Sequence, residues 1–298
     1  MPAEEVTIDW CEENYAVTLH IAEFWNTVTA ALTVIPALCW TPQKYPEGTE
    51  PFRLLHLIIA VLQTGSALFH GTLTWVGQLL DEVPLLIWCC ASFCLTVDTW
   101  TIRPGCRPGS DKNKKSVPRF AWAPGPQILF LMGAVQVVAT VVLYIFYAKI
   151  YETFLAVVVI QAGLHWPLIL GELFGYRKTG RLSVRRNPAF GTLRRLLFLH
   201  VALGYGGFGF WVIENMLCSD SAPGSQLAFI RSLHLHAIWH IVAILSLKYW
   251  HDFLVFYRLS VLNQCGMASV PEYRPTYLGL GSSVFAGDSQ PNGKDKAS

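Results

Sequence analysis

Three histidines in this chain have the spacing of metal ligands. His236 and His240 are four residues apart in "LHAIWH", so on a helix they lie on one face. His70 occurs in "SALFHGTL", which is far away along the chain but is again an apolar stretch. Two histidines at this spacing, joined by a third from another helix, are typical of a catalytic zinc site with an open fourth position. The pattern therefore indicates zinc held by His70, His236 and His240.

Two further polar side chains accompany these histidines. Ser66 lies four residues before His70 and shares its helix face, and Asp81 follows in "GQLLDE". A carboxylate near a metal can take the proton of an attacking water, and a hydroxyl can donate a hydrogen bond to a developing oxyanion. We therefore predict catalytic roles for Asp81 and Ser66. The alternative is structural, because histidines in apolar helices also hydrogen-bond across helices and stabilise a bundle.

The composition is that of a membrane protein. Of 298 residues, 53% are hydrophobic and only 14% are charged, whereas soluble domains carry about 25% charged residues. A net charge of +2 and the lack of a basic cluster interleaved with aromatic residues argue against a nucleic-acid partner. The eight cysteines are scattered without a C-x-x-C pair, so neither a cysteine zinc site nor a dense disulfide framework is expected.

Seven stretches are long and apolar enough to cross a bilayer as helices, which takes about 20 residues. They are residues 21–40, 52–74, 79–102, 127–148, 150–173, 195–217 and 233–256. We therefore predict an all-α fold. An acidic segment, 1–20, precedes a seven-helix transmembrane catalytic bundle, 21–257. A tail rich in Gly, Ser and Pro, 258–298, follows and is expected to be disordered.

Positive charge orients this bundle. Lys and Arg gather in the third and fifth connections, at 103–119 and 177–195, and such loops stay in the cytosol. The N-terminus is then lumenal or extracellular, and the C-terminus is cytosolic. Ser66, His70, Asp81, His236 and His240 then all fall near the outer ends of their helices.

Other polar residues have less definite roles. His165 lies in the middle of the fifth span and could line a cavity. His56 and His200 fall near predicted cytosolic ends, where interfacial histidines are expected. Glu214 lies near an outer end, as support for the site or as an interfacial acid.

Oxygen-bearing side chains crowd the segment before the first span, "DWCEENYAVTLHIAEFWN". Asp9, Glu12, Asn14 and Glu23 offer the hard oxygen ligands that suit calcium. The segment has no EF-hand pattern, and a solvated acidic N-terminus is the alternative.

These segments together resemble one family. The chain resembles the alkaline ceramidases, seven-transmembrane zinc amidohydrolases of the superfamily that includes the adiponectin receptors. The resemblance rests on "DWCEENY" with "AEFWNT", "SALFHGTL" running into "GQLLDE", "WVIEN" and "LHAIWH". The serine, histidine and aspartate elements alone indicate only the superfamily, whereas "DWCEENY" and "GQLLDE" narrow it to ceramidases.

The resemblance implies a function and a mechanism. Zinc held by the three histidines, with Asp81 and Ser66, would hydrolyse the amide bond of ceramide to sphingosine and a fatty acid. A membrane location in the endoplasmic reticulum or Golgi is implied, with the plasma membrane as the alternative, and no obligate protein partner is evident. Two alternatives stay open, namely a seven-helix lipid-sensing receptor and a zinc hydrolase of another lipid amide or ester.

The resemblance also implies two features of the outer side. Calcium would be bound by the side chains of Asp9, Glu12, Asn14 and Glu23 and by the backbone carbonyl of Trp10, and it would stimulate activity. A disulfide would join Cys11 to Cys218, which an oxidising lumen permits.

Overall fold

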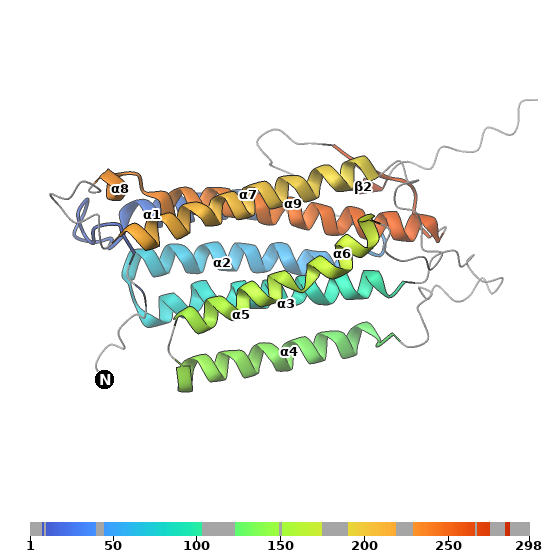
Figure 1. Ribbon diagram of the computed structural model, residues 1–298, viewed down its shortest axis with the longest axis horizontal. Helices are drawn as coiled ribbons and strands as arrows, with labels where there is room; N and C mark the ends of the chain where they lie inside the picture. Colours follow the sequence, from blue (N-terminus) through green and yellow to red (C-terminus); the bar gives the residue numbers. More distant parts are fainter. Residues whose placement is uncertain are drawn as a thin grey trace, which may run out of the picture.

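The computed structural model describes residues 8, 10–39, 45–102, 123–148, 151–174, 190–218, 229–265, 267–274 and 284–286. Within these residues the chain is almost entirely helical, and its long helices lie side by side along the long axis of the molecule (Figure 1). The first three long helices are α1 (Phe24–Cys39), α2 (Arg53–Thr72), which follows the 3-10 turn η1 (Glu50–Phe52), and α3 (Trp75–Trp100).

The second half of the bundle is built in the same way. It consists of α4 (Pro126–Leu143) with a π-helical continuation η2 (Tyr144–Ala148), α5 (Tyr151–Gly163), α6 (His165–Phe174), α7 (Phe190–Leu217), the short α8 (Phe229–Ser232) and α9 (Leu235–Gln264). In order along the chain these helices correspond to the predicted spans, with α5 and α6 together forming the fifth. The prediction of an all-α membrane fold is confirmed at this level.

Five helical segments in the described part of the chain have the length and hydropathy needed to cross a membrane. They are Glu50–Thr72, Trp75–Trp100, Pro126–Phe146, Phe154–Gly171 and Phe190–Leu217. Helix α1 is apolar but has 16 residues, and α9 is not among the five although it has 30 residues. The count of seven spans therefore stays a prediction. The orientation does too, because residues 103–122 and 175–189, which carry most of the basic connections, lie outside the described residues.

A tight antiparallel hairpin joins α2 to α3, as predicted. Leu73 adopts the left-handed conformation at the end of α2, with φ of 44°, and its backbone N–H donates to Phe69 O at 2.7 Å. The Thr74 side chain then caps α3 by accepting from Gly77 N at 3.2 Å. The two helices approach so closely that a Cβ added at Gly65 would lie 1.9 Å from the backbone oxygen of Leu80. This close approach sets the spacing between α2 and α3 near the hairpin that joins them.

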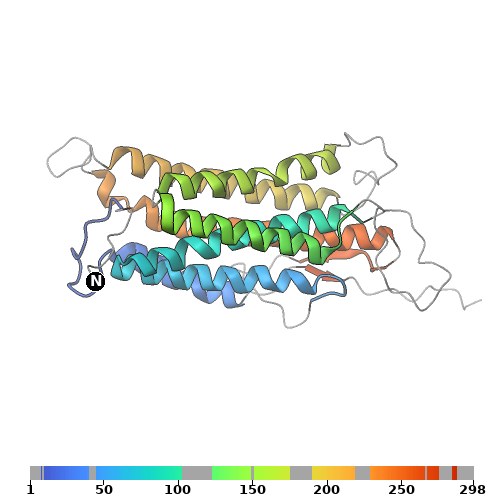
Figure 2. The same ribbon diagram turned by 90° about the horizontal axis from the view of Figure 1, so that it is seen from below.

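The C-terminal boundary differs from the predicted one. Helix α9 continues to Gln264, so the predicted tail 258–298 begins inside a helix. The reason is burial, because Leu259 and Leu262 pack in the core and Arg258 donates to Asp98 of α3 at 2.8 Å. Beyond α9, the strands β1 (Pro271–Tyr273) and β2 (Val284–Ala286) pair antiparallel. Figure 2 shows this two-stranded element beside the end of α9 that lies opposite the N-terminal segment.

Candidate metal centre and active site

The three predicted histidines converge in the structure. Their rings come from α2 and α9, and the candidate ligand atoms of His70, His236 and His240 all lie within 4.8 Å of one another. The ring centroid of His70 is 5.0 Å from that of His236 and 4.9 Å from that of His240. All three side chains are buried. Helical spacing places two of them on one face of α9, and the packing of the bundle brings the third to meet them.

Hydrogen bonds to the opposite ring nitrogens orient two of these histidines. His70 Nδ1 contacts Glu23 Oε2, a carboxylate oxygen that can only accept while it is ionised. His240 Nδ1 lies 3.1 Å from Thr29 Oγ1, whose own hydroxyl proton is donated to Trp25 O at 2.8 Å. Both Nδ1 atoms are therefore the protonated ones. The Nε2 lone pairs of His70 and His240 are left free to bind a cation, and carboxylates commonly hold metal-binding histidines in this way.

The nitrogen separations suit a tetrahedral ion. His70 Nε2 lies 3.3 Å from His236 Nε2. Ligand nitrogens bound to zinc at 2.0–2.1 Å with tetrahedral angles are also about 3.3 Å apart. Two lone pairs that face each other at this distance repel unless a proton or a cation lies between them. The donor set therefore fits a divalent metal with a preference for nitrogen.

The start of α9 is held in place by groups around His236. His236 N donates to Glu214 Oε2 at 2.6 Å, which satisfies one of the free N–H groups at the helix start. The indole of Trp10 stacks on the His236 ring with centroids 3.9 Å apart. Glu214 thus supports the site directly, which was one of the two roles that its position in the sequence allowed. The stacking of Trp10 could not be inferred from spacing.

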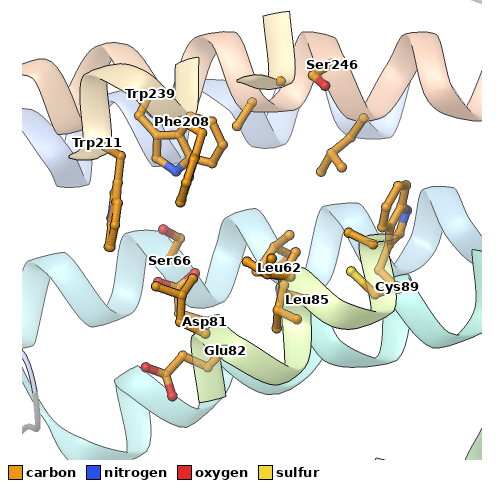
Figure 3. Close-up of a pocket in the computed structure, with 18 of the residues that line it drawn as sticks. Leu62, Ser66, Asp81, Glu82, Leu85, Cys89, Phe208, Trp211, Trp239 and Ser246 are labelled. Atoms are coloured by element: carbon orange, nitrogen blue, oxygen red, sulfur yellow. The ribbon is translucent and has the colours of Figure 1, made fainter. Parts of the chain in front are cut away.

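Ser66 and Asp81 form a pair beside this centre. Ser66 lies one turn before His70 on α2, and its hydroxyl hydrogen-bonds the Asp81 carboxylate on α3. Both residues line the same cavity as His236 and His240. Figure 3 shows the Ser66 and Asp81 side chains directed toward each other. The structure thus gathers all five residues predicted for the zinc and catalytic positions.

The cavity itself is large and mostly apolar. Its volume is about 470 Å³, and its walls come from α2, α3, α5, α6, α7 and α9. In Figure 3 the aromatic side chains of Phe208, Trp211 and Trp239 line the side opposite Ser66 and Asp81. His165 and His200 line it as well. The cavity role considered for His165 is confirmed, and the interfacial position expected for His200 stays a prediction. His200 is half-buried, and its Nδ1 lies 2.9 Å from Ser246 Oγ and 3.1 Å from Ser246 O.

His56 differs from its prediction as an interfacial histidine. It is 2% exposed, its Nδ1 contacts the Tyr45 hydroxyl, and its ring lies 3.7 Å from the ring of His251 between centroids. Tyr45 precedes α2, so this contact covers the start of the helix and buries a side chain that was expected near the membrane interface.

The N-terminal segment folds against the same end of the bundle. Glu12 accepts hydrogen bonds from Trp25 N at 2.6 Å and Asn26 N at 2.9 Å, and so caps α1. Glu23 Oε1 accepts from Trp10 N at 3.3 Å. Burial raises the pKa of the Glu12 carboxyl above its ordinary value, and the nearby Glu23 adds to the rise, against the lowering by the two backbone N–H groups. These acids thus share a confined space, which favours a cation nearby.

The remaining residues predicted for calcium are less informative. The Asn14 side chain is exposed, and Asp9 lies outside the described residues. Cys11 and Cys218 lie at disulfide-bonding distance, with Cα atoms 5.3 Å apart, a normal separation for a disulfide. Cys11 belongs to the N-terminal segment, and Cys218 directly follows the end of α7.

Comparison with known proteins agrees with these observations. The family model described as Ceramidase matches residues 3–269. Alkaline ceramidase YPC1 of Saccharomyces cerevisiae is 28% identical over 267 residues, which cover 86% of this chain and 78% of that protein. Alkaline ceramidase 1 of Homo sapiens is 26% identical over 249 residues, covering 81% and 79%. Alkaline ceramidase 3 of Mus musculus is 45% identical over 85 residues, covering 28% of this chain and only 32% of that protein. The resemblance inferred from the motifs is confirmed.

Proposed function

This chain belongs to the ceramidase family of enzymes, and on that premise we propose that it hydrolyses the amide bond of ceramide to sphingosine and a fatty acid. The observation that carries the proposal is the convergence of His70, His236 and His240 with the Ser66–Asp81 pair at an apolar cavity. An insoluble lipid amide needs an apolar chamber for its chains and polar groups at its reacting bond. Both features occur together here.

Within this proposal the three histidines hold zinc. When bound there, zinc supplies a Lewis acid and a water that ionises near neutral pH. The Asp81 carboxylate accepts a proton from the attacking water and passes it to the amide nitrogen as the C–N bond breaks. The Ser66 hydroxyl turns from Asp81 to donate to the carbonyl oxygen as that oxygen becomes negative. Water and amide thus become carboxylic acid and amine, with each proton accounted for.

The test combines metal analysis with turnover of ceramide by the detergent-purified full-length chain. His236→Gln is expected to lose both bound zinc and hydrolysis. His234→Asn is the matched control, because His234 has a left-handed backbone with φ of 46°, which asparagine tolerates, and it lies outside the trio. Full activity in metal-free protein would refute the proposal. Ceramide that binds without being cleaved would favour the lipid-sensing receptor instead, and cleavage of another lipid amide or ester alone would change the substrate.

Calcium stimulation is a separate part of the proposal. We infer that Glu12, Asn14, Glu23, Asp9 and the carbonyl of Trp10 bind calcium. The support is the burial of Glu12 and Glu23 in this segment, where the charge of Glu23 raises the pKa of Glu12.

Asn14→Ala tests the calcium site, because the Asn14 side chain is exposed and its removal should leave the fold intact. Glu13→Ala is the control, because Glu13 is also exposed and is not among the proposed calcium ligands. The expected result is a weaker calcium response in Asn14→Ala alone. Equal activity of the wild type in calcium and in a chelator would contradict calcium stimulation.

The topology proposal follows from the same end of the bundle. We propose that all seven helical segments span the membrane of the endoplasmic reticulum or Golgi, with the N-terminal segment on the lumenal side. Support comes from the Cys11–Cys218 geometry, because disulfides persist in oxidising compartments. Protection of an N-terminal epitope tag in sealed vesicles, with exposure of a C-terminal tag, is the expected result. The reverse pattern would contradict it.

A further inference from the structure

A second acid, Glu82, lines the cavity directly after Asp81 and has no part in the mechanism above. Its side chain is 6% exposed, and it lies on α3 near Asp81 in Figure 3. Glu82 Oε1 accepts a hydrogen bond from Gln78 Nε2 at 2.8 Å, the same nitrogen donates to the Tyr144 hydroxyl at 3.1 Å, and that hydroxyl also hydrogen-bonds the Glu82 carboxyl group. One oxygen of this carboxyl group is therefore fixed by a buried network.

The other oxygen is the informative one. Glu82 Oε2 is buried and has no hydrogen-bond partner among the described residues. A buried acceptor without a donor costs free energy, and more so when the group is charged. The cavity around it is mostly apolar, with Leu85 and Phe154 among its lining residues. A donor for Glu82 Oε2 is therefore best supplied by the molecule that fills the cavity.

The neighbouring residues show which part of that molecule lies there. Glu82 adjoins Asp81 in sequence, and both residues line the same cavity. A substrate whose amide lies at Ser66 and Asp81 would therefore present to Glu82 the atoms next to its amide nitrogen, not the far ends of its chains. In ceramide the carbons on either side of the nitrogen-bearing carbon both carry hydroxyl groups, which are hydrogen-bond donors.

We propose that Glu82 Oε2 accepts a hydrogen bond from a sphingoid hydroxyl and so makes the site selective for amides of hydroxylated amines over plain N-alkyl fatty amides. This inference rests on the proposed amide hydrolysis. Glu82 is a specificity residue in this account, since it contacts the substrate beside the reacting bond. Its bond to Gln78 holds the carboxylate in the orientation that recognition requires.

The test compares ceramide with an analogue of equal chain lengths that lacks both hydroxyl groups. The wild type is expected to show a higher kcat/KM for ceramide, and Glu82→Gln is expected to reduce the ceramide-to-analogue ratio by roughly 10- to 100-fold, the range of a hydrogen bond to a charged group. Cys89→Ala, two turns further along α3 in the same cavity, is the matched control. It is expected to alter both substrates alike and leave the ratio unchanged.

The outcomes separate the two proposals. A wild type that cleaves both amides equally well, or a Glu82→Gln variant with an unchanged ratio, overturns the role of Glu82 and leaves amide hydrolysis standing. A wild type that cleaves neither amide refutes both. Lower stability of Glu82→Gln would not obscure the result. The ratio of the kcat/KM values for ceramide and the analogue depends only on the folded, active fraction, and the wild-type ratio is measured independently of the variant.

Discussion

Replacing Gly65 with alanine is expected to separate α2 from α3 at the point where they carry Ser66 and Asp81. The added Cβ would lie 1.9 Å from Leu80 O and 2.4 Å from Leu80 C, both backbone atoms that cannot move aside alone. Ordinary contact begins at 3.4 Å, so the two helices have to part by about 1.5 Å. Such a shift takes the Ser66–Asp81 pair out of hydrogen-bonding distance.

The expected losses are large enough to measure. Overpacking of this kind costs about 1–3 kcal/mol of stability, and a displacement of about 1 Å near reacting groups can cost about 100-fold in rate. Thermal unfolding and kcat/KM for ceramide would be measured in the same detergent. Gly206→Ala is the matched control, because no atom lies within 4 Å of the Cβ that it would add to α7. A Gly65→Ala protein with the wild-type melting temperature and kcat/KM would refute the close approach of α2 and α3 as the cause of the Ser66–Asp81 geometry.

Three other predictions follow from the same structure. Thr29→Val removes the acceptor for His240 Nδ1 and is expected to weaken zinc affinity by about 10- to 100-fold in chelator competition. Asp98→Asn breaks the buried pair with Arg258 and is expected to destabilise the protein by about 3–5 kcal/mol in denaturant unfolding. Trp250 lines the cavity ten residues beyond His240 on α9, which is about 15 Å along the helix axis. An extended acyl chain of about twelve carbons, at about 1.25 Å each, has this length. Trp250→Leu is expected to raise relative kcat/KM for longer ceramides by up to about fourfold per added methylene.

Each of these predictions has its own control. Thr27 also bonds a backbone oxygen four residues earlier, Glu23 O just before α1, so Thr27→Val should leave zinc affinity near the wild-type value. An equal loss in the two threonine variants would contradict the role of Thr29. For the ion pair, a charge-free double replacement at both positions should recover most of the stability lost by Asp98→Asn. For Trp250, equal chain-length dependence of kcat/KM in Trp250→Leu and the wild type would show that Trp250 does not limit the length of the acyl chain.

Those features of the fold that depend on local sequence patterns could be predicted. Apolar runs and their polar breaks gave the helices in order, and the short link at Leu73 and Thr74 gave the α2–α3 hairpin. The end of α9 could not be found in this way. In the sequence Arg258 indicates the start of a polar tail. In the structure its charge is neutralised inside the bundle by Asp98, 160 residues earlier, and that pairing cannot be inferred from local patterns. A charge is expected in the core only when its counter-charge can be placed there.

The candidate site shows the same division. Residues separated by four positions on a helix could be grouped, so His236 with His240 and Ser66 with His70 were found as pairs. The groups that orient them could not, because Thr29 is one of three threonines in the apolar helix α1, and such hydroxyls commonly bond their own helix backbone. The lack of a hydrogen-bond partner for Glu82 Oε2 could not be predicted either, because it depends on the side chains that surround Glu82 in the folded protein.

Glu23 is the residue for which spacing and structure give the most different accounts. In the sequence it is an acid at the start of a span, part of a segment suited to calcium or to a solvated acidic N-terminus. In the structure its carboxylate contacts His70 Nδ1 from one oxygen and Trp10 N from the other. A Glu23 variant is therefore expected to change zinc affinity and calcium response together, and it cannot assign either effect to one ion. Asn14→Ala leaves the contact with His70 intact, so it should lower calcium response at unchanged zinc affinity. Loss of zinc from Asn14→Ala would mean that the two sites are coupled by more than this one carboxylate.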